Sequence, residues 1–312
     1  MIEKLLQTVF APLFWLGFIG SATWLVGLQQ QSPFWLLPLF AIALACLFAA
    51  EAWLPYASDW NRSHDDRSRD LVHALVNETM TALALSAIPL VAALSPWSML
   101  WPQRWPFALQ LLLAIVVADF GITLAHWLSH RWPPLWRLHS VHHSVTRMYG
   151  LNGLMKHPLH QMVEALAGVA PLLLIGMPLD VAALLAFAIA IQLLLQHANV
   201  DMRLGALRHV VAWAPLHRYH HIRYGKAGDV NFGLFFTWWD RWLLRSAFDG
   251  RAYRLSSDDL GIGSRPDYPR AYFAQLVEPF RASLVEAAAP TLPDGLQRDA
   301  LSLRERVPRR GG

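Results

Sequence analysis

The histidines of this sequence fall into three clusters whose spacing suits metal binding. Twelve of the 14 histidines lie between His126 and His221. The clusters are His126 with His130, His139 with His142 and His143, and His217 with His220 and His221. Residues at positions i, i+3 and i+4 share one face of a helix, so the imidazoles within each cluster can reach a common region.

The number of imidazoles points to more than one metal ion. Eight imidazoles exceed the roughly four to six protein ligands that one ion takes, so we expect a binuclear site. Imidazole binds zinc, copper, iron and nickel, which leaves the metal open. The sequence contains neither the H-E-x-x-H motif of zinc proteases nor the Glu-x-x-His pairs of soluble di-iron bundles. This pattern favours redox chemistry on an apolar substrate.

The composition indicates that the histidines are carried by an integral membrane protein. Hydrophobic residues make up 55% of the 312 residues, charged residues make up 15%, and the mean hydropathy is +0.30. Soluble domains contain about 25% charged residues. The single cysteine, Cys46, excludes a disulfide framework. The basic residues form no nucleic-acid-binding motif, so we expect no nucleic-acid partner despite the net charge of +4.

Apolar segments predict four membrane-spanning helices and a hairpin, since a bilayer crossing needs roughly 20 apolar residues. The predicted spans cover residues 9–28, 34–54, 72–95 and 106–125. A fifth apolar tract, 161–197, is interrupted at 176–180. Each half of it is short, so we expect a hairpin of two short spans or a re-entrant pair. The predicted fold class is all-α: a polytopic helical membrane bundle with a histidine-rich helical cap.

The basic residues predict which side of the membrane the histidines face. With these spans, all of the 26 Lys and Arg residues except Arg104 lie on one side. The positive-inside rule assigns that side to the cytoplasm. We therefore expect the histidine clusters and the C-terminus on the cytoplasmic side. The last 25 or so residues are polar and rich in Pro and Arg, which predicts a weakly ordered tail.

The order of the clusters resembles the fatty acid hydroxylase/sterol desaturase superfamily of membrane di-iron oxygenases. Over roughly residues 115–245, other motifs are similar to that family in order and spacing. They are Asp119, the block Leu135 to Ser144, His157-Pro158, Gln196 to Asn199, Asn231-Phe-Gly233 and Trp239-Asp-Arg241. The sequence departs from the family pattern at three places: Trp127 replaces a common Arg, Ile122 and Thr123 stand where Tyr is common, and Leu244-Arg245 replaces a glycine.

The resemblance implies an enzyme that uses O2 to hydroxylate or desaturate an unactivated C–H bond of a lipid taken from the bilayer. It implies two iron ions held by nine histidines: His126, His130, His139, His142, His143, His197, His217, His220 and His221. The sequence contains no flavin, haem or dinucleotide motif, so electrons are expected from a separate reductase, ferredoxin or cytochrome.

We expect three regions along the chain. Residues 1–105 form an N-terminal transmembrane region with three spans, and residues 106–248 form the catalytic domain. Residues 249–312 form a polar, partly disordered tail.

Several polar residues near the clusters have two interpretations. Asp119 lies seven residues before His126 on the same predicted helix face, so it either accepts a ring N–H of that ligand or makes a structural hydrogen bond. His157 and His160 either contact a metal or shape a turn. Asn231 and Asp240 either order the cap or approach the metals. Of the other histidines, three are expected to be structural: His64, His73 and His209.

Three other protein classes use clustered histidines. A membrane zinc hydrolase needs a carboxylate base, and no cluster contains one. A metal transporter needs polar residues distributed through several spans, whereas these histidines gather at one face. A non-catalytic relative of the family is expected to have lost ligands, and all eight cluster histidines are present.

Overall fold

A computed structural model describes residues 1–250, 253–281 and 287–297, and every regular element within these ranges is helical. Four helices are long and apolar enough to cross a membrane: Ile2–Leu28, Pro33–Trp53, Phe107–Ser129 and Leu179–His197. A bent pair, Arg67–Ser86 with Ile88–Leu94, makes a fifth if it is counted as one span. The predicted polytopic helical bundle is confirmed.

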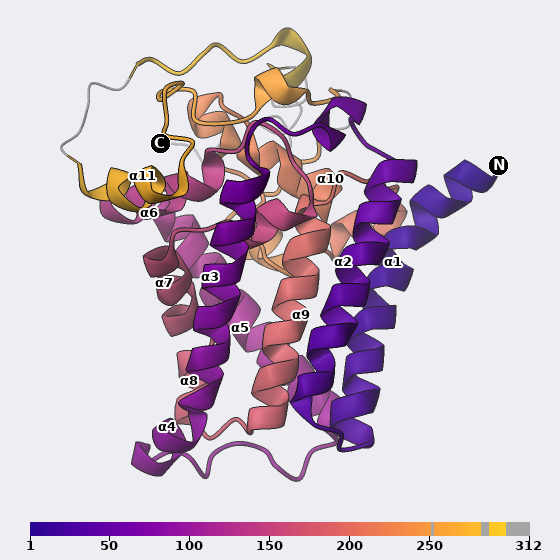
Figure 1. The fold of residues 1–312 in the computed structure, drawn as a ribbon, viewed down its shortest axis with the longest axis vertical. Helices are drawn as coiled ribbons and strands as arrows, with labels where there is room; N and C mark the ends of the chain where they lie inside the picture. Colours follow the sequence, from indigo (N-terminus) through magenta and orange to yellow (C-terminus); the bar gives the residue numbers. More distant parts are fainter. Residues whose placement is uncertain (251–252, 282–286, 298–312) are drawn as a thin grey trace, which may run out of the picture.

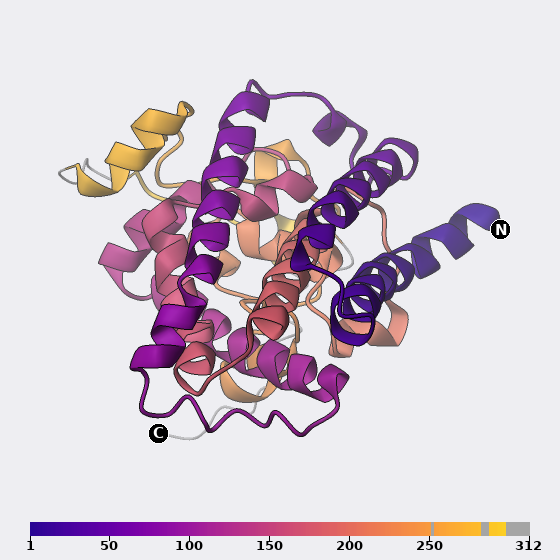
Figure 2. The ribbon, with the colours of Figure 1, turned by 60° about the horizontal axis from the view of Figure 1, so that its bottom comes forward.

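One helix occupies the middle of the bundle. Helix α9 (Leu179–His197) packs against α1 (Ile2–Ala22), α2 (Leu36–Trp53), α3 (Arg67–Ser86) and α5 (Phe107–Ser129) (Figures 1 and 2). Within the apolar window of α9, 78% of the residues are buried, against 17% for the span that contains α2. Because α9 is covered on all sides, the histidine at its end is held inside the protein.

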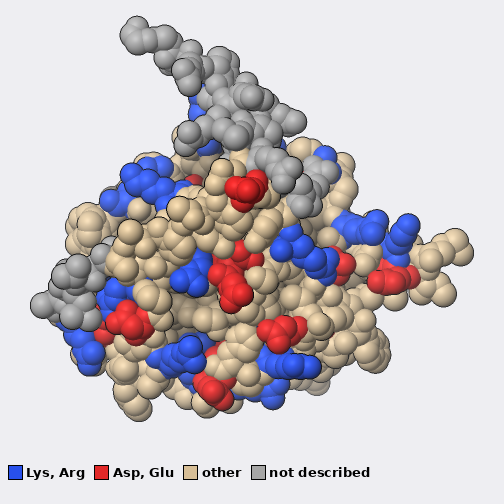
Figure 3. Space-filling view, turned by 90° about the horizontal axis from the view of Figure 1, so that it is seen from above, with Lys and Arg blue, Asp and Glu red and all other residues tan. Residues whose placement is uncertain are grey.

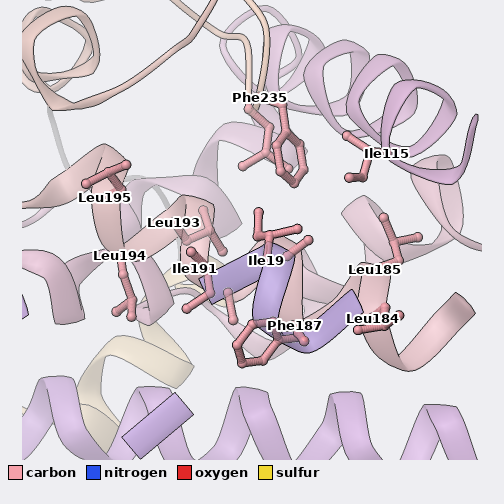
Figure 4. Close-up of a cluster of buried hydrophobic side chains, with 14 of the residues drawn as sticks. Ile19, Ile115, Leu184, Leu185, Phe187, Ile191, Leu193, Leu194, Leu195 and Phe235 are labelled. Atoms are coloured by element: carbon pink, nitrogen blue, oxygen red, sulfur yellow. The ribbon is translucent and has the colours of Figure 1, made fainter. Parts of the chain in front are cut away.

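Branched apolar side chains fill the space around α9. Leu185, Ile191 and Leu194 of α9 lie in one core cluster with Ile19 of α1 and Ile115 of α5 (Figure 4). Lipid tails are as apolar as these side chains, so close packing rather than exclusion from water holds such helices together. The core therefore fixes how the helices cross.

Two glycines allow α5 and α7 (Pro158–Gly168) to cross at close range. A Cβ atom on Gly121 would meet the carbonyl of Ala167. A Cβ atom on Gly168 would lie 2.7 Å from the carbonyl oxygen of Ala118. Small residues at a crossing let two backbones approach in this way. The crossing places the start of α7 beside the histidine-bearing end of α5.

The cap consists of short helices at one end of the bundle. It includes α6 (Pro133–His143), α10 (Ala214–His217) and α11 (Tyr272–Val277), near the ends of α5 and α9 (Figure 1). Helix α6 begins with Pro133 and Pro134, whose fixed φ suits a first turn and which lack the N–H that this turn leaves unpaired. The three histidine clusters therefore gather at one end.

Two of the predicted spans differ from the structure. The second half of the predicted hairpin is α9, an uninterrupted helix of 19 residues that is long enough to cross a membrane, so this half matches the short-span alternative and not a re-entrant segment. The first half is broken into α7 and α8 (Ala170–Leu174). The third span begins at Arg67 and bends by 42° before α4 (Ile88–Leu94). Pro89 accounts for the bend because it lacks the N–H that would continue the helix.

The described part of the C-terminal region packs onto the cap. Leu255, Leu260 and Leu296 are buried in one cluster, and α11 contacts α3. The weakly ordered tail stays a prediction: residues 287–297 are described, and residues 298–312 lie outside the described residues. The division of the chain into three regions stays a prediction.

Candidate metal centre

The structure brings the nine predicted ligand histidines together in two groups at the cap end of the bundle. The first group is His126, His130, His139, His143 and His220. The second group is His142, His197, His217 and His221. Within each group, one ring nitrogen per residue lies within 4.8 Å of all the others. The groups adjoin, since the rings of His143 and His221 stack with centroids 4.6 Å apart.

Four segments distant in sequence deliver these rings. His126 lies in the last turn of α5, which His130 caps, and His197 is the last residue of α9. Helix α6 carries His139, His142 and His143. Helix α10 ends at His217, and a 3-10 turn follows over Arg218–His221. Each segment ends or turns at its histidines, so their rings can converge.

Backbone hydrogen bonds fix the protonation of His126 and His220. The Nδ1 atom of His126 lies 2.9 Å from the carbonyl oxygen of Phe232, and that of His220 lies 2.8 Å from the carbonyl oxygen of Val230. A carbonyl only accepts, so both Nδ1 atoms carry hydrogen, and in a neutral ring Nε2 then has a free lone pair. The two Nε2 atoms face each other at 2.8 Å.

The second group repeats this arrangement with different residues. Nδ1 of His142 donates to the carbonyl of Met155 at 2.9 Å, and Nδ1 of His197 donates to that of Leu193 at 3.0 Å. Their Nε2 atoms face each other at 3.2 Å. Each group thus brings together Nε2 atoms that carry no hydrogen and can only accept hydrogen bonds.

Two facing lone pairs repel each other unless a cation lies between them. Neighbouring Nε2 atoms in the groups are 2.8 to 3.3 Å apart. Two imidazoles that bind one ion at about 2.1 Å have a similar spacing. The donor set and its tautomers therefore fit a metal ion in each group, and all-imidazole ligands suit iron as well as zinc or copper.

Burial keeps the cap histidines neutral. Desolvation lowers the pKa of His139, His142 and His143 well below the usual 6.5, and neighbouring rings lower it further. Burial likewise lowers the pKa of His217 and His221 well below that value. Neutral imidazole is the form that binds a metal, so the rings are ready for ligation near neutral pH.

Asp229 is a candidate site residue that no sequence motif indicated. Its Oδ1 atom lies 2.9 Å from Nδ1 of His130, so the carboxylate accepts the ring N–H and leaves Nε2 free. A carboxylate in this position orients a ligand histidine and increases its basicity. The one feature of the sequence that could have drawn attention to Asp229 is its place two residues before the Asn231-Phe-Gly233 motif. No spacing rule links Asp229 to His130.

Asp119 is buried but does not contact His126. Its carboxylate accepts hydrogen bonds from the backbone N–H groups of Phe235 and Phe236, at 2.7 and 3.2 Å, and from the indole of Trp239 at 2.8 Å. Asp119 was expected either to accept a ring N–H of His126 or to make a structural hydrogen bond, and its contacts are structural hydrogen bonds. Asp119 and His126 both lie on α5, as expected. The carbonyl of Phe232, and not Asp119, accepts the Nδ1–H of His126. Asp119 instead anchors the loop that supplies this carbonyl.

His157 and His160 lie outside both groups. His157 caps α7 by accepting the N–H of Leu159 at 3.1 Å, and its other nitrogen lies 3.2 Å from the carbonyl of Leu276. His160 lies 2.9 Å from the Ser129 hydroxyl. Its ring is 4.5 Å from that of His139, so it packs behind a ligand candidate.

Asn231 and Asp240 order the loop beside the centre. Asn231 has a φ of 53°, a conformation that Asn tolerates better than most residues, and its side chain bonds the carbonyl of Leu216 at 2.8 Å. Asp240 accepts the backbone N–H groups of Phe232 and Gly233, each at 2.8 Å. Both residues thus hold the segment that bonds His126.

Comparison with known proteins places this helical scaffold in a family. A family model described as fatty acid hydroxylase matches residues 111–244. Ornithine lipid hydroxylase OlsE from Rhizobium tropici is 35% identical over 251 residues, which cover 78% of this chain and 74% of that protein. This chain belongs to the fatty acid hydroxylase/sterol desaturase superfamily.

A second superfamily member matches a shorter stretch. Methylsterol monooxygenase 1 from Danio rerio is 29% identical over 144 residues, 44% of this chain and 47% of that protein. No solved structure matches the chain. The region matched by the superfamily model contains all nine histidines of the two groups, while α1, α2 and α3 lie outside it.

Proposed function

We propose that the protein is a membrane di-iron oxygenase that hydroxylates a C–H bond of a lipid. The family relationship supports an oxygenase over a zinc hydrolase or a metal transporter. Both relatives are named as oxygen-inserting enzymes, which favours hydroxylation over desaturation. An ornithine lipid is the first substrate to test, because the relative that shares most of its length with this chain is named for it.

The observation that carries the proposal is the pairing of acceptor nitrogens. In both groups, hydrogen bonds to the backbone leave the Nε2 lone pairs of facing rings free, at 2.8 Å for His126 with His220 and 3.2 Å for His142 with His197. A cation in each group satisfies them. The two histidine groups would hold two irons, which would supply the O2 chemistry of the overall reaction RH + O2 + 2 e⁻ + 2 H⁺ → ROH + H2O.

The residues of the chain hold the ligands and exclude water. Hydrogen bonds to carbonyls and to Asp229 fix the tautomers before metal binds, so the groups need little reorganisation. Phe232 is 1% exposed, and its ring lies 5.4 Å from His126 and 5.1 Å from His130. An apolar ring at this position keeps bulk water away from the first group.

We propose that electrons come from a separate protein that docks on the cap. A pocket of about 390 Å³ reaches the first group from the cap surface, where His130, His143 and His220 line it. Arg223 and Lys226 lie at the same pocket. An acidic reductase, ferredoxin or cytochrome suits this basic rim, because opposite charges steer association.

We propose that the cap faces the cytoplasm. Lys and Arg are spread over the cap face (Figure 3), while the segment between α4 and α5, which contains Arg104, lies at the opposite end of the bundle (Figure 1). The positive-inside rule orients such a distribution with the cap inward.

Metal analysis combined with two substitutions tests the function. Purified protein is expected to contain about two irons per chain and to convert an ornithine lipid to a product heavier by one oxygen when O2 and an electron donor are present. His220→Ala in the first group and His142→Ala in the second are each expected to lower the iron content and abolish product, because each removes a ligand. His209→Ala, at an exposed histidine, is the control. Zinc in place of iron, or full activity in both variants, would overturn the proposal.

A further inference from the structure

A cavity inside the bundle leads toward the histidine groups. It has a volume of about 300 Å³ and lies between α3, α5, α7, α8 and α9. Most of its lining is apolar and includes Leu85, Ile122, Leu173 and Ile189. Three of these helices, α3, α5 and α9, belong to candidate membrane spans, so an acyl chain matches the chemistry of the cavity.

One end of the cavity adjoins the second histidine group. Leu193 lines the cavity, and its carbonyl accepts the N–H of His197 at 3.0 Å. Lys156 also lines it and directly follows Met155, whose carbonyl accepts the N–H of His142 at 2.9 Å. A lipid in the cavity therefore reaches the residues that hold two of the ligand candidates.

The polar residues of the cavity lie at that same end. Helix α3 runs away from the cap and α9 runs toward it (Figure 1), so Glu78 is nearer the histidines than Ile88, and Leu193 is nearer than Ala182. Lys156 lies at the cap end as well. The cavity is amphipathic, with its charged end beside the candidate centre and its apolar end deeper in the bundle.

Most charged and polar groups at the cap end have partners within the protein. The ammonium of Lys156 donates to the carboxylate of Glu164 at 2.5 Å. The side-chain amide of Gln161 donates to the hydroxyl of Thr81 at 3.1 Å. Glu78 differs, because its carboxylate has no hydrogen bond or ion pair with any residue in the described part of the chain.

The unpartnered carboxylate gives this end of the cavity an electrostatic preference. Lys156 attracts Glu78 at a distance, but Lys156 is itself paired with Glu164, so the ionised form of Glu78 has no basic residue to pair with. An ionisable group in an apolar, membrane-embedded site is costly unless it is paired. A ligand with a positively charged hydrogen-bond donor supplies the missing partner.

We propose that Glu78 selects lipids whose head group carries a protonated amine and holds that amine at the cap end of the cavity. This inference rests on the proposed lipid oxidation. The acyl chain then extends toward Ile88 and Ala182, away from the histidines. Oxidation therefore falls on a carbon near the amine-bearing head group and not on the far end of the acyl chain.

A binding measurement tests the selection independently of catalysis. The probes are an ornithine lipid with a free amine and the same lipid N-acetylated, each radiolabelled and titrated into the full-length protein in nanodiscs. The wild-type protein is expected to bind the amine form about tenfold more tightly, the size of one charge-assisted hydrogen bond. Glu78→Gln is expected to remove the preference, and Glu78→Asp is expected to restore part of it. Asp180→Asn, at an exposed acid at the far end of α9, should leave it unchanged.

The outcomes separate this inference from the proposed function. Equal binding of the two lipids by the wild-type protein would overturn the role of Glu78 even if no variant folds. A tenfold preference that persists in a folded Glu78→Gln variant would overturn it as well. If the preference depends on Glu78 but neither lipid is oxidised, the selection stands and the proposed function fails.

The position of the added oxygen gives a second readout. Tandem mass spectrometry of the product is expected to place the oxygen in the fragment that contains the head group or the first carbons attached to it. Oxygen near the methyl end of an acyl chain would contradict the orientation of the lipid in the cavity.

Discussion

His130 shows how a single residue outside the clusters can control a metal ligand. Its ring is held by the carboxylate of Asp229 at 2.9 Å, whereas His126 and His142 are held by backbone carbonyls. A backbone carbonyl is present whatever the side chain of its residue. The orientation of His130 therefore depends on the identity of residue 229, whereas the orientations of His126 and His142 do not depend on a particular side chain. The first group is therefore the more sensitive to substitution around it.

Asp229→Ala is expected to weaken iron binding by about 10- to 100-fold, the usual cost of losing the hydrogen-bond partner of a ligand histidine. Asp229→Asn should retain most of the affinity, because its side-chain oxygen still accepts the N–H of His130. Chelator competition followed by iron analysis measures both. An unchanged affinity in Asp229→Ala would show that the contact does not orient the ring.

At the scale of elements, the loop after Val230 depends on two buried carboxylates on different segments. Asp119 on α5 accepts two backbone N–H groups and an indole N–H from residues 235–239. Asp240 closes the same loop onto itself through Phe232 and Gly233. The loop in turn supplies the carbonyls that bond His126 and His220. A change in α5 is thus transmitted to ligands on another element.

Asp119→Asn is expected to destabilise the protein by about 1–3 kcal/mol and to lower its iron content. The amide would present an NH2 group to N–H donors, so at least one buried donor loses its acceptor. Thermal unfolding in detergent and iron analysis check this, with Asp180→Asn as a matched surface control. A melting temperature equal to that of the wild type would contradict it.

At the scale of the whole molecule, the N-terminal helices are attached to the cap by polar contacts. The carboxylate of Glu51, near the end of α2, accepts the backbone N–H of Gly150 at 2.7 Å and that of Asn199 at 2.9 Å. Helices outside the region matched by the superfamily model therefore support the segments that hold the histidines.

The proposed orientation predicts different labelling at the two ends of the bundle. In a Cys46→Ser background, Gln103→Cys between α4 and α5 should react with a membrane-impermeant maleimide on intact cells. Arg270→Cys on the cap should react only after the membrane is opened, because the cap is expected to face the cytoplasm. The reverse pattern would place the histidines on the other side.

The local features of this protein followed from its sequence. The helical spacing of the three clusters, the predicted spans at 9–28, 34–54 and 106–125 and the collection of histidines at one end depend on local residue patterns, and each is present in the structure, whereas the span predicted at 72–95 is a bent pair of helices. Hydropathy could not decide between the two alternatives for the hairpin, because it does not show that α9 is central and continuous while the first half is divided into α7 and α8.

Only the tertiary structure decided how the histidines are shared between the groups. His142 and His143 are neighbours in sequence but belong to different groups, as do His220 and His221. Successive residues on a helix point about 100° apart, so which partners each ring meets depends on the elements packed around it. The contact of Asp119 and the unpartnered state of Glu78 were likewise decided by packing, since contacts between segments tens of residues apart leave no local pattern in the sequence.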